Sequence, residues 1–216
     1  MSNNNLELKG TKEFRSFSMP DLTIQAEGNV IEGHAGVFNQ ITNIGGMFNE
    51  VIERQAFTNT DFTDVLFSVN HDLNKIPLAR SRNNNANSTL QLKVDEGGLY
   101  TRATLDIENN SEAKALYSAI QRKDISGMSF IFYVRGEDWE GLDTDMPTRH
   151  ITDISKVIEV SAVSFPAYSQ TDINARSETL ENAKNALDSV KAEYISKQNQ
   201  IAREQRQKEL IIKTLL

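Results

Sequence analysis

The chain contains no cysteine, which excludes disulfide bridges, thiolate–metal sites and cysteine nucleophiles. It has no apolar run long enough to cross a bilayer, and its polar first residues lack the apolar stretch of a signal peptide. The net charge is −7, which argues against a dedicated nucleic-acid-binding protein. Its three histidines lack a zinc-binding spacing such as H-E-x-x-H. We therefore expect a soluble intracellular protein with no cofactor and no nucleic-acid or membrane partner.

The hydrophobic residues that are present suit one main domain with an appendage. They make up 38% of 216 residues, enough for a real core. We divide the chain into a flexible tail (1–11), a main domain (12–168), a linker (169–177) and a helical segment (178–216). The main domain alternates in the manner of β-strands, with one helix whose N-cap is expected to be Ser111. The predicted strands are Phe14–Ser18, Leu22–Glu27, Val30–Phe38, Asp64–Val69, Ile76–Arg80, Thr89–Val94, Leu99–Leu105, Ser126–Val134 and Val157–Ser164.

The C-terminal segment is charged, rich in glutamine and free of glycine and proline. Its apolar residues recur at alternating steps of three and four from Leu180 to Tyr194, which is the spacing of a heptad seam. Two interpretations fit this pattern. The segment is either an amphipathic helix packed on its own domain or a coiled coil that docks with a partner.

Three apolar segments each contain one residue of a type that serine hydrolases use in catalysis. Glu159 interrupts KVIEVSAVSFPAY, His71 ends VLFSVNHD, and Ser129 lies within DISGMSFIFYV. A buried carboxylate is costly unless a donor meets it, so Glu159 needs a partner inside the protein. A serine hydroxyl becomes a nucleophile when an imidazole takes its proton, and a third group fixes the imidazole tautomer. The three residues are therefore candidates for a serine hydrolase triad.

Each of these residues also has a plain structural interpretation. Ser129 would then be a small polar residue facing water, and Glu159 would form an ion pair with Arg149 or Arg176. Asp72 directly follows His71 and is expected to cap the next turn instead of orienting the ring.

The other polar residues are weaker candidates for catalysis. His34 lies on a glycine-flanked strand and is expected to be structural. His150 is expected to be exposed, although it is an alternative third member of the triad. The segment Gly136–Met146 reads as a solvated loop. An esterase would show a G-x-S-x-G turn between strand and helix, which Ser129 lacks.

Five motifs in order carry a resemblance over Val30–Arg176. They are GHAGVFN, GGMFNEVIERQAF, VNHD followed by IPLARS, SGMSFIFYV, and EVSAVSFPAY. Together they resemble the prohead (capsid maturation) serine proteases of tailed bacteriophages, which are related to the herpesvirus assembly proteases. The resemblance implies an α+β fold, mainly β, with a herpesvirus-protease-like β-barrel core flanked by helices. We add to it the long C-terminal helix.

The same resemblance implies roles for individual residues. His71 becomes the general base, Ser129 the nucleophile and Glu159 the third member, while Ser126 is the rival serine in SGMS. Candidates for the oxyanion hole are main-chain amides near Ser129, and Arg80 or Arg82.

The implied activity is that of a serine endopeptidase acting through an acyl-enzyme. It would cleave the scaffold or the major capsid protein, and itself, inside the assembling procapsid in the host cytoplasm. We expect self-association, and a C-terminal segment that behaves like a scaffold. The competing interpretation is a non-catalytic assembly scaffold with the same fold, in which the three residues lie apart.

Overall fold

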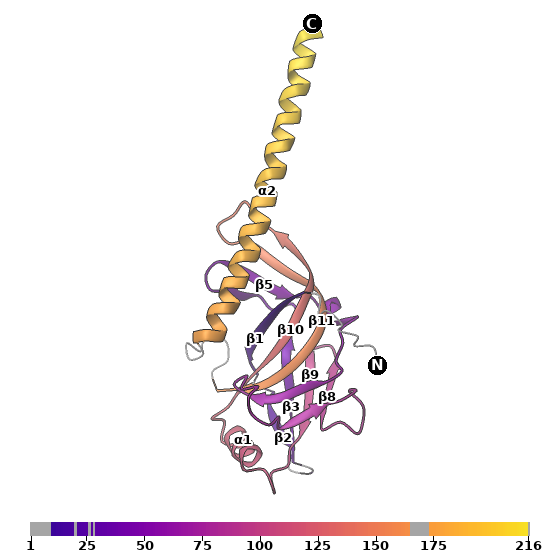
Figure 1. Cartoon of the computed structure of the whole chain (residues 1–216), viewed down its shortest axis with the longest axis vertical. Helices are drawn as coiled ribbons and strands as arrows, with labels where there is room; N and C mark the ends of the chain where they lie inside the picture. Colours follow the sequence, from indigo (N-terminus) through magenta and orange to yellow (C-terminus); the bar gives the residue numbers. More distant parts are fainter. Residues whose placement is uncertain (1–9, 20, 26, 28, 165–172, 216) are drawn as a thin grey trace, which may run out of the picture.

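The described part of the chain folds as two β-sheets with two α-helices (Figure 1). The structure is a computed structural model that describes residues 10–19, 21–25, 27, 29–164 and 173–215. The first helix, α1 (Ser111–Gln121), is short, and the second, α2 (Ile173–Leu215), runs far beyond the sheets. The predicted class, α+β with mostly strands and a long C-terminal helix, is confirmed. Within the described ranges, neither helix has the length and apolar character needed to span a membrane.

The larger sheet is organised around one long strand, β11 (Thr148–Val163). One edge of β11 pairs with the antiparallel strand β10 (Gly127–Glu140), and β1 (Thr11–Ser18) lies beyond β10. The other edge has two parallel partners: β5 (Phe48–Ile52) at the start of β11 and β6 (Val65–Val69) near its end. Strands β4 (Thr42–Ile44) and β7 (Ala79–Ser81) extend β5 and β6 respectively.

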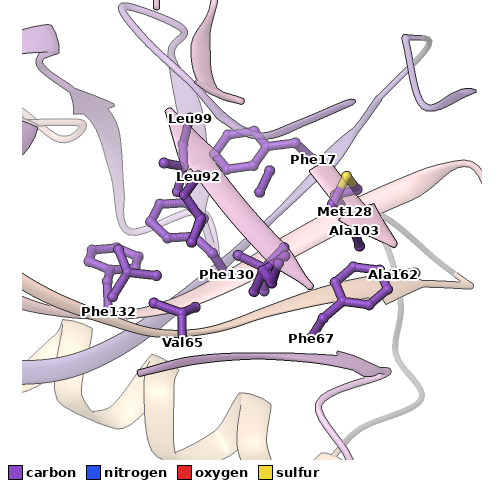
Figure 2. Close-up of a cluster of buried hydrophobic side chains, with 14 of the residues drawn as sticks. Phe17, Val65, Phe67, Leu92, Leu99, Ala103, Met128, Phe130, Phe132 and Ala162 are labelled. Atoms are coloured by element: carbon purple, nitrogen blue, oxygen red, sulfur yellow. The ribbon is translucent and has the colours of Figure 1, made fainter. Parts of the chain in front are cut away.

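The smaller sheet has the order β2 (Thr23–Gln25), β3 (Val30–Val37), β9 (Gly98–Thr104) and β8 (Leu90–Val94). A short 3-10 helix, η1 (Arg54–Phe57), packs on β11. Most of the buried apolar residues of the two sheets form one cluster, which includes Phe67, Phe130 and Phe132 (Figure 2). A side chain at Gly36 would approach the Phe130 ring to 2.8 Å, so glycine lets the two sheets pack closely there.

The two sheets do not close into the expected β-barrel. Closure would need an edge strand of one sheet to pair with an edge strand of the other, and the described strands make no such pair. Strands β7 and β8 come close, but the Thr89 hydroxyl stands between them. It accepts the main-chain N–H of Arg80 at 2.9 Å and donates to the Arg80 carbonyl at 3.2 Å. The Thr89 side chain thus satisfies the main-chain N–H and C=O of Arg80, which strand pairing across a closed barrel would otherwise use. The herpesvirus-like fold stays a prediction.

Several predicted boundaries were wrong. Strands β4 and β5 were missed, and the supposed loop Gly136–Met146 is strand as far as Glu140, because β10 and β11 continue to pair there. The strand expected over Ile76–Arg80 is confined to β7. The cap of α1 is Asn110, whose side chain accepts the N–H groups of Glu112 and Ala113, so Ser111 is instead the first helical residue.

The base of α2 packs on the large sheet. Ala183 and Leu187 are buried against Phe48 of β5, with Trp139 of β10 beside them. Beyond Tyr194 the helix is exposed. Residues 173–177 of the expected linker belong to α2, while 169–172 of that linker and 1–9 of the expected tail lie outside the described residues. The division into domains otherwise stays a prediction.

Candidate active site

Four serines form a row across the large sheet. Their Cα partners are Ser16 with Ser129, Ser129 with Ser161, and Ser161 with Ser68, on the neighbouring strands β1, β10, β11 and β6. Directly paired residues project from the same face of a sheet. Met128 and Phe130, which flank Ser129 on β10, point to the opposite face and into the core. The row therefore gives this face small polar side chains where the core face has bulky ones.

His71 is brought over this row by a sharp turn after β6. Asn70 and His71 have φ angles of 51° and 60°, in the left-handed region that most side chains avoid. The Asn70 N–H donates to the Ala162 carbonyl at 3.0 Å, and the His71 N–H donates to Ser161 Oγ at 2.9 Å. The ring of Phe14 packs against the imidazole, with 5.2 Å between ring centroids. Two consecutive main-chain N–H groups thus hold the turn to β11, and Phe14 of β1 packs on the ring.

Glu159 is fully buried, and its carboxylate is satisfied inside the protein. One oxygen lies 2.8 Å from His71 Nδ1 and the other accepts the Ser68 hydroxyl. The ion pair expected with Arg149 was wrong, because Arg149 binds other carboxylates. The side chain of Arg176 lies outside the described residues. The donor that a buried glutamate requires is supplied by histidine and serine.

Ser129 completes a continuous chain of contacts. Its Oγ lies 2.7 Å from His71 Nε2, so serine, imidazole and carboxylate are joined in sequence. The Ser129 hydroxyl is also 2.8 Å from the Arg15 carbonyl and accepts from Ser16 Oγ at 3.0 Å. Ser129 has no exposed surface, which contradicts the plain interpretation that it faces water. His71 is the accessible member, with 12% of its side chain exposed.

The hydrogen positions follow from counting protons. A carboxylate only accepts, so His71 Nδ1 carries a proton toward Glu159, and Nε2 of the neutral ring is an acceptor. The single Ser129 proton then goes either to Nε2 or to the Arg15 carbonyl. When His71 is protonated, its Nε2–H donates to Ser129 Oγ. The hydroxyl proton of Ser129 then goes to the Arg15 carbonyl. The arrangement that activates Ser129 therefore requires neutral His71.

The strand beside Ser129 is anchored by a buried group of charges, which sequence reasoning missed. The Arg15 guanidinium binds Glu13 and Glu50, and Arg149 binds the same two carboxylates as well as Glu137. Burial raises the pKa of Glu13, but the charges and hydrogen bonds of the two arginines outweigh it and hold that pKa below its ordinary value. These pairs fix β1 against β5 and β11, and with it the Arg15 carbonyl that meets Ser129.

The other predicted residues lie outside this chain of contacts. Ser126 is exposed just before β10. His34 binds Asp21 and Asp95, and His150 of β11 is half-buried against Glu53. Asp72 caps the turn through its contact with the Asn74 N–H, at 3.2 Å.

The two arginines proposed for the oxyanion hole are engaged elsewhere. The Arg80 guanidinium binds Asp64, and the main-chain N–H groups of Arg80 and Arg82 donate to the hydroxyls of Thr89 and Ser88. A role for either arginine in an oxyanion hole stays a prediction. Over the described part of the chain, no cluster of three His, Asp or Glu side chains is arranged to hold a metal ion.

Two supporting residues, Ser68 and Ser161, were also missed. Ser68 donates to Glu159, Ser161 accepts from His71, and their hydroxyl oxygens are 3.1 Å apart. The signal was present in part, since Ser161 follows Glu159 by two residues and shares its face.

The chain was compared with known proteins. The model of a protein family described as caudovirus prohead serine protease matches residues 17–186, a stretch that contains all three predicted site residues. Among solved structures, the capsid assembly protease gp21 of bacteriophage T4 is 12% identical, with a TM-score of 0.44 over 72% of this chain and 98% of that chain. Comparison with curated proteins gave no match.

Proposed function

The chain belongs to the caudovirus prohead serine protease family, and on that premise we propose that Ser129, His71 and Glu159 are its nucleophile, general base and orienting carboxylate. One observation carries the proposal: two contacts, of 2.7 Å and 2.8 Å, join the three side chains in the order that acyl transfer requires. The competing interpretation, a scaffold with a dispersed triad, would need these residues apart.

In the proposed reaction, Ser129 Oγ attacks the peptide carbonyl carbon while its proton passes to His71 Nε2. Glu159 accepts from Nδ1 throughout, which holds the ring in place and stabilises the imidazolium that forms. The imidazolium then gives its proton to the departing amine, which leaves an ester on Ser129. Water attacks that ester, His71 takes a proton from the water, and the proton finally returns to Ser129 as the acid is released.

The Arg15 carbonyl competes for the nucleophile's proton in the resting site. While the Ser129 hydroxyl donates to this carbonyl, its proton is turned away from His71. Ser129 also has no exposed surface, so a peptide carbonyl can reach Oγ only after neighbouring atoms move. The structure is thus a closed state of the proposed site, in which the nucleophile is covered by its neighbours.

A phage prohead protease acts in the assembling procapsid, in the cytoplasm of the host. We propose that its substrates are the scaffold or the major capsid protein, and that it also cleaves itself. The exposed part of α2, beyond Tyr194, would direct co-assembly with the capsid protein, because it extends away from the domain and buries none of its length there (Figure 1). Deletion of residues 195–216 should then abolish packaging into procapsids while leaving the packed base of α2 intact.

The catalytic proposal is tested by co-expressing the chain with its cognate capsid protein and following intact masses over time. The wild type is compared with Ser129→Ala and with Ser126→Ala, a matched change at the exposed rival serine. Loss of the nucleophile should slow cleavage by about 10⁴-fold or more, so no product should appear with Ser129→Ala. Equal cleavage by wild type and Ser129→Ala would refute the assignment. Procapsids that form without any cleavage would favour the scaffold.

A further inference from the structure

A pocket with a volume of about 400 Å³ opens beside the His71 turn. Ser68, whose hydroxyl binds Glu159, forms part of its wall, and so do Asn70 and Asp72, which flank His71 in the chain. The opposite wall is one side of α1. The pocket therefore shares a residue with the proposed active site and lies directly next to its general base.

The strand register gives the distance from Ser68, in the wall of this pocket, to the nucleophile. Ser68 and Ser129 are separated by a single strand, because each of them pairs with Ser161. Neighbouring strands lie about 4.8 Å apart, which places the two Cα atoms about 10 Å from each other. An extended peptide advances about 3.3 Å per residue. A side chain two or three residues from a scissile bond at Ser129 is therefore about as far from the nucleophile as Ser68, a residue of the pocket wall.

The lining determines what kind of side chain the pocket would take. Most of it is apolar, from the end of β6, the segment that follows β6, and α1: Val69, Ile76, Leu78, Ala115, Leu116 and Ala119. Lys75 and Glu112 at its margin bind each other at 3.0 Å, so their charges are already paired. Ile76 is 82% exposed, so an occupant of the pocket would remove apolar surface from water.

We infer that this pocket is a substrate subsite, which binds an apolar side chain of the polypeptide two or three residues from the bond that is cut. This rests on the proposed peptidase function and adds the substrate preference that the function leaves open. Contacts made at such a distance from the reacting bond position the peptide, and they also decide which bond is presented to Ser129.

The test uses two changes that alter the pocket and a control that does not. Ile76→Ser removes the exposed apolar wall, and Ala115→Phe fills the pocket from the exposed face of α1. Ile41→Ser is the matched control, because Ile41 is another exposed isoleucine, 67% accessible, outside the pocket lining. All three changes are at exposed positions, where substitutions usually leave folding intact.

The full-length variants are incubated with a peptide library derived from a bacterial proteome, and the cut sites are identified by mass spectrometry. The wild type and Ile41→Ser should favour Leu, Ile, Val, Met or Phe over charged residues about tenfold at one position, and both pocket variants should lose most of that preference. No apolar preference, or a preference unchanged in both pocket variants, would overturn the inference. So would a change only in self-association, measured by light scattering, because the occupant would then be a second copy.

A separate measurement distinguishes failure of the subsite from failure of the peptidase proposal. A small fluorophosphonate reacts with an activated serine and needs no peptide subsite. Labelling of Ser129 in every variant, together with unaltered cut sites, would refute only the subsite. No labelling and no cleavage by the wild type would refute the peptidase proposal, and the subsite with it.

Discussion

Replacing Ser161 with alanine removes the acceptor that holds the main chain of His71. The His71 N–H donates to Ser161 Oγ at 2.9 Å, and Ser161 is fully buried, so the alanine variant leaves this donor without a partner. His71 has a φ of 60°, a conformation that a residue with a side chain keeps only when its surroundings impose it. We therefore expect Ser161→Ala to release the turn that carries the imidazole.

The magnitude follows from two competing costs. An unsatisfied buried N–H costs about 1–3 kcal/mol. The left-handed conformation of His71 costs about 1–2 kcal/mol, which the hydrogen bond to Ser161 offsets in the wild type. Without that bond the native turn is no longer clearly favoured, and a shift of the ring by about 1 Å can reduce a rate by about 10²-fold. We expect a fall of that order in the rate of Ser129-dependent cleavage.

Ser81→Ala is the matched control for this experiment. Ser81 is also fully buried, accepts a main-chain N–H, from Asn84 at 2.9 Å, and donates to the Phe62 carbonyl. Both variants lose a buried hydroxyl with an N–H partner, so urea unfolding should show similar losses of stability. Only Ser161→Ala should also lose cleavage of the peptide library and labelling by the fluorophosphonate.

The comparison must be made at a temperature where both variants are fully folded, as judged by circular dichroism. If Ser161→Ala then cleaves and labels as fast as Ser81→Ala, the Ser161 hydroxyl does not position His71. The buried serine would in that case contribute only to stability.

Three further predictions concern charge. Glu159→Gln keeps the shape of the side chain but cannot stabilise an imidazolium, so labelling of Ser129 should slow by about 10³–10⁴-fold, while circular dichroism stays unchanged. Arg149→Met leaves two buried carboxylates, Glu13 and Glu50, to share the cation of Arg15, and should lower the free energy of unfolding in urea at neutral pH by about 3–5 kcal/mol. The pKa of Glu13 is lowered, so its stabilisation is present above its ordinary value of 4.5 and is lost as pH falls further; Glu13→Gln should flatten that acid limb of the urea midpoint. A wild-type acid limb that persists unchanged in the variant would contradict the role of Glu13.

Local signals were strong enough to predict most of the strands and the three side chains that meet. Ser129 alternates with bulky core residues, and Glu159 lies in a β-branched run, so both patterns fix a strand and a face without any knowledge of neighbours. The missed strand β5 reads FNEVI, in which a glutamate takes a core position. Glu50 is buried there only because Arg15 and Arg149 meet it from distant strands, and a window of sequence cannot show that pairing.

The row of four serines is a second feature that could not be predicted from the sequence. Each of its four serines is an unremarkable polar residue within its own strand, and a common function emerges only when β1, β10, β11 and β6 are set in register. A slip of one residue in any of these strands would turn its serine to the core face. The buried arginines and glutamates that pin β1 therefore also maintain the alignment of Ser16 with Ser129. Weakening that anchor should disturb the nucleophile even though none of its charges touches the Ser129 hydroxyl.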